Sequence, residues 1–300
     1  MKNKKLMGNL MLLLTAMIWG TAFVFQRKGM ESIEPITFTA VRMTMAAVVI
    51  SLTAFLANSK RKADDKRSQE ELQKSRKETI LGGTVCGILL AAASIFQQKG
   101  LVYTAAGKAG FITAMYILLV PIINTLLFRK KNPMIVWVSV LIGVFGMYLL
   151  CVTGDLRLTH GDLLVSVCAV LFSFQILCCD HCVRFGDPLV ISAIQASVCA
   201  VISLISAFLL EDPSWEKVIP AAVPILYCGI VSGGIGYTLQ MAAQKYTDPA
   251  TASLLMSLES VFAAVAGALL LHEQMSVREI AGCVTMFIAI ILVQLPHPEK

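Results

Sequence analysis

The chain is poor in charged residues. Only 15% of its 300 residues are Asp, Glu, Lys or Arg, whereas soluble domains contain about 25%. Hydrophobic residues make up 57%. Water is therefore not the main solvent of this chain, and little sequence is left between the apolar stretches for a separate soluble domain.

Motifs of nucleotide-driven pumps and membrane hydrolases are also missing. Gly107-Lys108 is not followed by the Ser or Thr of a phosphate-binding loop. His272-Glu273 has Ser276 where a zinc protease needs its second His, and no Gly-x-Ser-x-Gly occurs. We therefore expect no catalytic residues, no cofactor and no enzymatic activity.

Ten apolar stretches are long enough to cross a membrane. About 20 helical residues, rising 1.5 Å each, span a hydrocarbon core of about 30 Å, and lipid offers backbone groups no partners. We expect an all-α integral membrane protein with its first helix retained rather than cleaved as a signal peptide. The ten transmembrane helices are expected at 6–27, 35–57, 79–99, 105–128, 134–152, 161–180, 188–210, 218–242, 248–271 and 277–295.

The basic residues are distributed unequally between alternate loops. With the N-terminus inside, 17 of the 25 Lys and Arg residues fall in cytoplasmic segments and six fall outside. This bias follows the positive-inside rule. We expect a multi-pass protein of the cytoplasmic (inner) cell membrane with both termini cytoplasmic. Since this topology accounts for the net charge of +6, we expect no nucleic-acid partner.

The sequence contains an internal repeat. At an offset of 153 residues Gly8 aligns with Gly161, and at an offset of 143 Tyr103-Thr104 aligns with Tyr246-Thr247. A charged cytoplasmic loop at 58–78 absorbs the difference between the two offsets.

Each repeat contains five expected helices. Because five is odd, the second copy must enter the membrane from the opposite side, which gives the inverted repeat found in many secondary transporters. We expect the first five-helix repeat at 1–152 and the second at 153–300.

Ionisable residues deep in the membrane indicate candidate sites, because a charge at the bilayer centre costs roughly 2.5 to 3.5 kcal/mol. Glu259 is the only acidic residue near the middle of a span. It could bind a substrate ammonium or exchange a proton, or it could be a structural partner of Arg42. Arg42 lies about 10 Å below the outer surface, seven residues after Pro35. It could hold a carboxylate, snorkel outward or tie helices together.

Neutral polar and aromatic residues inside the spans form a second group of candidates. Tyr116 is the repeat equivalent of Glu259. A glutamine in a membrane helix could equally form a hydrogen bond with a neighbouring helix. The predicted substrate-binding residues beyond Glu259 and Arg42 are Trp19, Phe23, Gln97, Tyr116, Gln175, Tyr237 and Gln240.

The nine cysteines are scattered, with one exception. Cys178-Cys179-Asp180-His181-Cys182, at the end of the sixth span, could ligate a soft metal. The sequence shows no obvious second pair of ligands, so we assign no metal site.

Several short motifs share an order and spacing with one known family. They are Ile18-Trp19-Gly20, Glu34-Pro35-Ile36 leading to Arg42, the run from Gly100 to Ala114 followed by Val120-Pro121, the run from Ser257 to Ala264, and Glu273 followed by Gly282. Over nearly its whole length the chain resembles the EamA-like branch of the drug/metabolite transporter superfamily. In two places it departs from the pattern: Arg129-Lys130 replaces a frequent Gly-Glu, and Ser260 replaces the proline usual after Glu259.

The resemblance implies a ten-helix carrier, usually an exporter of amino acids or other small metabolites, with a central cavity between its halves. We predict a secondary transporter that exports a small polar metabolite such as an amino acid by alternating access, in contact with the lipid bilayer. A coupling proton and a homodimer are left open. The alternative is an intramembrane metal sensor or membrane enzyme that uses the cluster at 178–182.

Overall fold

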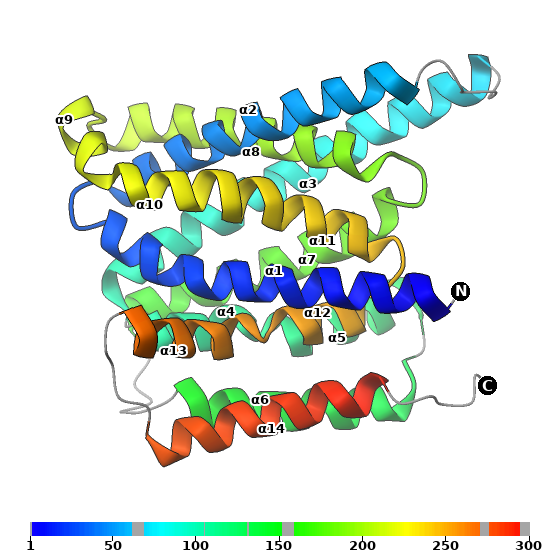
Figure 1. Ribbon diagram of the computed structural model, residues 1–300, viewed down its shortest axis with the longest axis vertical. Coiled ribbons are helices and arrows are strands. Elements are labelled where there is room, and N and C mark those ends of the chain that lie inside the picture. Colours follow the sequence, from blue (N-terminus) through cyan, green and yellow to red (C-terminus); the bar gives the residue numbers. More distant parts are fainter. Residues whose placement is uncertain are drawn as a thin grey trace.

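The computed structural model describes residues 2–61, 69–104, 106–130, 132–151, 159–270 and 276–294, and every regular element in these ranges is helical. The helices run along one common direction in stacked layers (Figure 1). Helix α1 begins and helix α14 ends at the same edge of the molecule, as an even number of crossings requires. We call this the N-terminal edge and the other the opposite edge.

The helices follow the predicted spans closely. In chain order they are α1 (Lys2–Gly29), α2 (Pro35–Arg61), α3 (Gln69–Tyr103), α4 (Ala106–Ala114), α5 (Tyr116–Phe128), α6 (Met134–Cys151), α7 (His160–Cys182), α8 (Pro188–Leu210), α9 (Trp215–Val218), η1 (Ile219–Ala221), α10 (Ala222–Leu226), η2 (Tyr227–Gly236), α11 (Tyr237–Gln244), α12 (Pro249–Met256), α13 (Glu259–Leu270) and α14 (Val277–Gln294).

Ten crossings are assembled from these elements. Among the described residues, eight helical stretches are long and apolar enough to cross a membrane, and Met134–Leu149 is a shorter apolar helix. Helix α14 packs beside α6 and completes the set (Figure 1). The charged loop expected at 58–78 lies partly outside the described residues, and Glu273 lies outside them entirely.

Several helix starts follow directly from local sequence. Asp187 and Asp248 each precede a proline at the first helical position, and their side chains accept hydrogen bonds from the first turns of α8 and α12. Helix α7 begins with a capping box, in which Thr159 and Asp162 exchange hydrogen bonds between side chain and backbone.

The fourth and ninth spans are each built from two shorter helices. The fourth is interrupted at Met115, between α4 and α5, and the ninth at Ser257-Leu258, between α12 and α13. No proline lies at either break, and Ser260 does not prevent the interruption. The two breaks are equivalent in the repeat, so α5 begins at Tyr116 and α13 at Glu259.

The eighth span also departs from a plain α-helix, because Tyr227–Gly236 is a π-helix. A wide turn of this kind inside a helix often marks a functional site. Gly229 lets the π-helix approach α2 closely: a Cβ atom there would lie 3.0 Å from the carbonyl oxygen of Arg42. This contact fixes the backbone of α2 at Arg42.

The inverted repeat appears in matching contacts at the two edges. At the opposite edge Thr104 Oγ1 donates a hydrogen bond to Asp162 Oδ1 at 2.9 Å. At the N-terminal edge Thr247 Oγ1 donates one to Asn9 Oδ1 at 3.0 Å. The offsets of 143 and 153 residues relate these two pairs, so the same junction between halves is built once at each edge.

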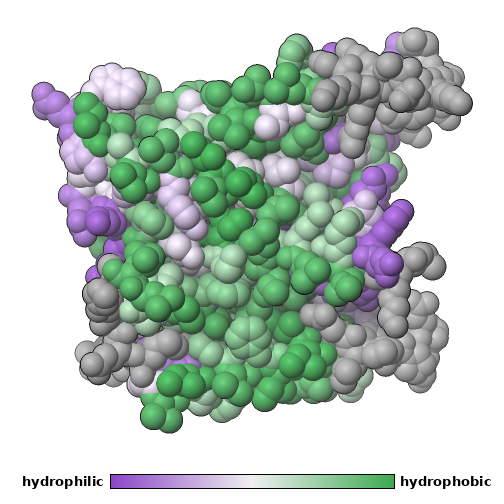
Figure 2. All heavy atoms as spheres, in the orientation of Figure 1, coloured by the Kyte–Doolittle hydropathy of each residue, from purple (hydrophilic) through white to green (hydrophobic). Residues whose placement is uncertain are grey.

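The outer surface is apolar around the middle of the molecule. Hydrophobic side chains cover the centre of the view in Figure 2, and hydrophilic ones gather toward the edges where the loops lie. Large side chains such as Leu126 (73% exposed) and Phe208 (72% exposed) point outward. A belt of this kind fits contact with lipid tails rather than water.

Candidate functional site

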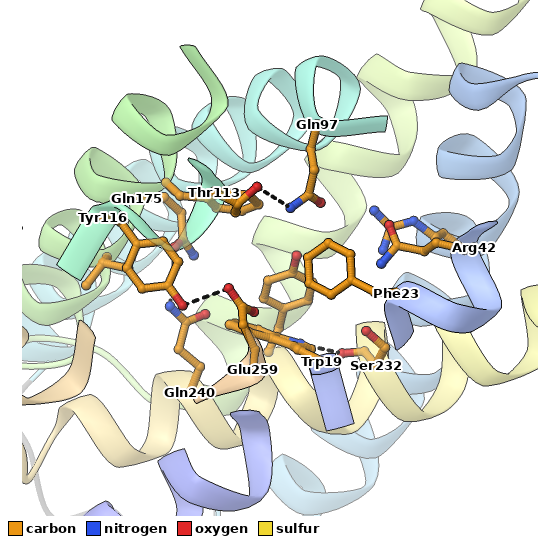
Figure 3. A pocket seen from close by; sticks show the side chains of 14 residues that line it. Trp19, Phe23, Arg42, Gln97, Thr113, Tyr116, Gln175, Ser232, Gln240 and Glu259 are labelled. Carbon is orange, nitrogen blue, oxygen red and sulfur yellow. Dashed lines mark hydrogen bonds between the residues drawn. The ribbon is translucent and has the colours of Figure 1, made fainter. Parts of the chain in front are cut away.

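A pocket lies between the two halves, with about 480 Å³ of space that no atom fills, part of it open to the surroundings. Fourteen residues line it, seven from each half (Figure 3). They are Trp19, Phe23, Gln26, Arg42, Gln97, Thr113 and Tyr116 from the first half, and Phe172, Gln175, Ile176, Ser232, Tyr237, Gln240 and Glu259 from the second.

All nine residues predicted to bind substrate lie in this lining. The structure therefore brings them together from α1, α2, α3, α5, α7, α11 and α13. Their contact with a substrate stays a prediction. Five lining residues were not predicted: Gln26, Thr113, Phe172, Ile176 and Ser232.

Glu259 lies at the first position of α13, next to the helix break, and is 4% exposed. Tyr116 Oη donates a hydrogen bond to Glu259 Oε1 at 2.9 Å. The backbone of α13 at Glu259 packs closely on α1, because a Cβ at Gly20 would lie 2.5 Å from the carbonyl oxygen of Glu259. Glycine in the Ile18-Trp19-Gly20 motif is thus required for this approach.

Arg42 is 3% exposed and lines the same cavity. Its Nε atom is buried without a hydrogen-bond partner, and within the described ranges no ion pair joins Arg42 to Glu259. Figure 3 shows the two charged groups on different sides of the Phe23 ring. The expected alternative of an Arg42 and Glu259 pair is therefore not what the structure contains.

Two aromatic rings, those of Trp19 and Tyr237, line the same cavity. The rings of Trp19 and Tyr237 have centroids 5.0 Å apart, and Trp19 Nε1 donates to the carbonyl oxygen of Ser232 at 3.3 Å. A Cβ at Gly236 would lie 2.6 Å from that nitrogen, so only glycine leaves room for the indole. The π-helix thus both accepts the Trp19 hydrogen bond and makes space for the ring.

Amide side chains form a network along one wall. Gln175 Nε2 donates to Gln195 Oε1 at 2.9 Å, and Gln240 Nε2 donates to Gln175 Oε1 at 3.3 Å. Gln240 Oε1 is buried without a hydrogen-bond partner in the part of the chain that the structure describes. Across the cavity Gln97 Nε2 donates to Thr113 Oγ1 at 3.4 Å. The free acceptor could receive a hydrogen bond from a bound molecule.

The lining obeys the internal repeat, which could have revealed two of the missed residues. Equivalent positions from both halves reach the cavity in four cases: Trp19 and Phe172, Phe23 and Ile176, Gln97 and Gln240, and Tyr116 and Glu259. Phe172 and Ile176 were overlooked because they are ordinary apolar residues. Nothing in the sequence distinguished Thr113 or Ser232 from other small polar residues in the spans.

Comparisons with known proteins agree with this architecture. The model of the EamA-like transporter family matches residues 6–152 and 159–295. An uncharacterized transporter from Archaeoglobus fulgidus is 28% identical over 97% of this chain and 87% of its own length. The uncharacterized transporter YoaV from Bacillus subtilis is 22% identical over 89% of each chain. A crystal structure of a protein with 18% identity shares the fold, with a TM-score of 0.75 over 96% of both chains.

Proposed function

The chain belongs to the EamA-like transporter family, and from this premise we propose that it is a secondary carrier that exports a small polar metabolite such as an amino acid by alternating access. It is a multi-pass membrane protein. We place it in the cytoplasmic membrane with both termini inside, from the distribution of its basic residues. Family membership favours transport over a metal sensor or an enzyme.

One observation carries the substrate class: the cavity contains one basic and one acidic group that are not paired with each other. The planar guanidinium of Arg42 suits a carboxylate, which it can bind with two parallel hydrogen bonds. Glu259 suits an ammonium group, and the rings of Trp19 and Tyr237 suit an apolar side chain between them. An amino acid carries these groups together, whereas a neutral nucleobase would leave the buried Arg42 charge unpaired.

Two features support alternating access. Each half contributes seven lining residues, so rocking of the halves would open the cavity to one side at a time. Interrupted helices begin at Tyr116 and Glu259, as in carriers whose half-helices end at the substrate. Among the residues that the structure describes, the Glu259 side chain has only the Tyr116 hydroxyl as its hydrogen-bond partner, so it is the group that we propose to exchange a coupling proton.

The experiment is a flux measurement with the full-length protein in proteoliposomes. Vesicles are tested with single amino acids and nucleobases, with and without a pH gradient. We expect saturable flux of amino acids that accelerates when protons are driven against the substrate flow. Absence of saturable flux for every amino acid, or equal flux for nucleobases, would reject the proposed substrate class.

The role of Glu259 is tested with Glu259→Gln, which keeps the size of the side chain but cannot ionise. We expect flux to fall by about tenfold or more, the equivalent of about 1.4 kcal/mol, and the response to the pH gradient to disappear. The matched control is Glu279→Gln, because Glu279 lies in the first turn of α14, away from the cavity. A variant at Glu259 that keeps both proton dependence and substrate preference would show that this assignment is wrong.

A further inference from the structure

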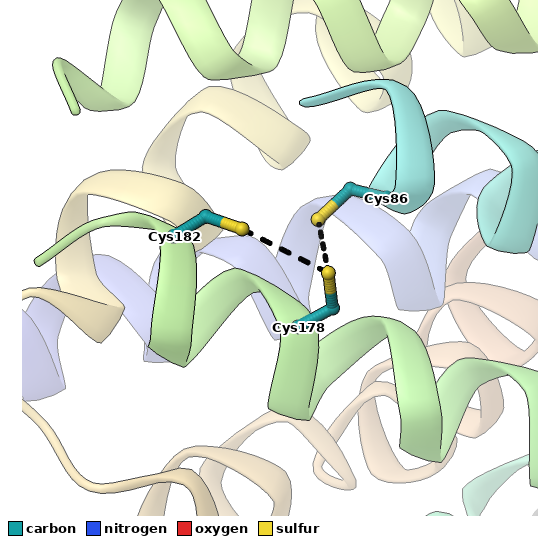
Figure 4. Close-up of side chains that lie close together, drawn as sticks. All are labelled: Cys86, Cys178 and Cys182. Carbon is teal, nitrogen blue, oxygen red and sulfur yellow. Dashed lines mark hydrogen bonds between the residues drawn. The ribbon is translucent and has the colours of Figure 1, made fainter. Parts of the chain in front are cut away.

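A second site lies outside the cavity, where three thiols from two helices converge. Cys178 and Cys182 are one turn apart on α7, and Cys86 reaches them from α3 (Figure 4). The sulfur atoms of Cys86 and Cys178 are 3.2 Å apart, and those of Cys178 and Cys182 are 3.8 Å apart. All three lie within 4.8 Å of one another. The sequence showed only the α7 part of this cluster.

We propose that Cys86, Cys178 and Cys182 bind one soft d10 metal cation, monovalent copper or a zinc-like divalent ion. Metal–sulfur bonds to such ions are about 2.3 Å long, so three sulfurs around one ion in a plane lie about 4 Å apart. The separations of 3.2 and 3.8 Å are slightly shorter than this value, and all three sulfurs lie within 4.8 Å of one another. Side-chain rotations that move each sulfur atom by less than about 1 Å are therefore enough to form the site.

The surroundings select for a soft ion. Asp180 is the acidic residue within the α7 run, and its carboxylate is held by Arg184 at 2.6 Å, while the His181 ring packs against Phe185. The thiol of Cys179 lies 3.8 Å from that of Cys86. The donors within reach are thus sulfur atoms, which prefer copper and zinc over magnesium or calcium.

Packing in this region brings the sulfurs together and shields them from water. Cys86 is 0% exposed and Cys182 is 7% exposed, whereas Cys178 is half-buried. A Cβ at Gly82 would collide with the sulfur of Cys182, so glycine one turn before Cys86 lets Cys182 approach α3. Met241 is buried in the same hydrophobic cluster as Cys86 and Cys182.

The site joins the two halves of the carrier. Cys86 belongs to the first half, and Cys178 and Cys182 belong to the second, near the N-terminal edge where α7 ends. A bound ion would add three metal–sulfur bonds across this junction. Metal binding would therefore oppose any motion that separates α3 from α7, and this inference does not depend on which substrate is carried.

The test uses the purified, reduced full-length protein and Cd²⁺ as the probe, because thiolate–cadmium bonds give an ultraviolet charge-transfer band. We expect the band to saturate at one ion per chain. The triple variant Cys86→Ser, Cys178→Ser, Cys182→Ser should lose it. The matched control replaces Cys168, Cys199 and Cys228, three buried cysteines outside the cluster, and should keep it.

A second readout covers the case in which the triple variant folds poorly. The single variant Cys86→Ser should bind Cd²⁺ at least about tenfold more weakly, since loss of even an outer partner of a metal site costs that much. Cd²⁺ should raise the Tm of the wild-type protein and not that of the variant. Competition with Cu(I) and Zn²⁺ then distinguishes the two kinds of ion.

Three results would overturn the proposal. The first is a band of equal strength in the cluster variant and the control. The second is wild-type protein that shows neither a band nor a Tm shift. The third is a Cys86–Cys178 disulfide, found by mass spectrometry of alkylated protein, that persists under reducing conditions and occupies the thiols.

Discussion

Arg42 in α2 and Gln195 in α8 occupy equivalent positions in the two halves, and so do Tyr116 in α5 and Glu259 in α13. In the first pair the first half carries the charge, and in the second pair the second half carries it. Gln195 bonds to Gln175 in the amide network, while Arg42 has an unpartnered Nε at the cavity wall. The halves thus share one scaffold, and their polar groups differ where they meet the cavity.

The two edges of the molecule, in contrast, keep equivalent contacts in both halves. Thr104 with Asp162, and Thr247 with Asn9, form the same junction at opposite ends of the molecule. A carrier that rocks between two states needs equivalent contacts at both edges, because each edge must close in one state. Symmetry is thus kept at the edges, where the proposed rocking motion requires it, and lost at the charged positions that we propose to recognise the substrate.

The largest expected effect comes from removing the asymmetry at Arg42. Arg42→Gln gives the first half the glutamine that the second half has at the equivalent position, Gln195. Amino acid flux at low concentration should fall about thirtyfold or more, the equivalent of about 2 kcal/mol, because the substrate carboxylate loses its partner. The Tm in detergent should rise, because the substitution removes a buried cation whose Nε has no hydrogen-bond partner among the described residues. Flux assays and thermal unfolding measure the two effects.

Arg42→Lys is the matched control, since it keeps the charge but not the planar fork of donors. It should retain part of the flux and show little change in Tm. A structural role for Arg42 makes the contrary prediction, namely a lower Tm in Arg42→Gln with the flux of correctly folded protein unchanged. That pair of results would contradict the recognition of a carboxylate.

The next effect, on stability, should be the same in both halves. A Cβ at Gly161 would lie 2.9 Å from the carbonyl oxygen of Gly100, and one at Gly8 would lie 3.1 Å from that of Ala243. Gly161→Ala and Gly8→Ala should each lower the free energy of unfolding by about 1–3 kcal/mol, because the helices must separate. Thermal or denaturant unfolding in detergent measures the change.

Gly110→Ala is the control for these variants, because no atom of the described residues lies within 4 Å of a Cβ built there. It should leave stability unchanged or raise it by up to about 1 kcal/mol, since alanine favours the helix. If only one of the two edge glycines were sensitive, the edges would not be equivalent junctions.

The spans could be predicted from the sequence because length and apolarity are local properties. The helix breaks before Tyr116 and Glu259 could not be predicted, since no proline marks them. The ninth span is interrupted where Gly20 lets α1 contact it, which is a property of the tertiary packing. The charged candidates were recognisable because a charge in a membrane is costly. The contact between Cys86 and Cys178 could not be predicted, because it depends on how α3 packs on α7 and no local sequence pattern indicates that packing.

The smallest effect concerns Glu34 and Asp187, the equivalent residues before α2 and α8. Asp187 accepts a hydrogen bond from Leu189 N in its own helix, whereas Glu34 pairs with Lys217 at 2.6 Å, across the two halves. The hydrogen bond from Lys217 lowers the pKa of Glu34. The pair therefore stabilises the fold at pH values above the usual glutamate pKa of about 4.3, and this contribution is lost as the pH falls through the lowered value.

The Tm difference between wild type and Glu34→Gln should be small at pH 7, because the pair is partly exposed and screened, and should vanish in acid. A difference that persists at low pH would show that Glu34 acts through packing rather than charge.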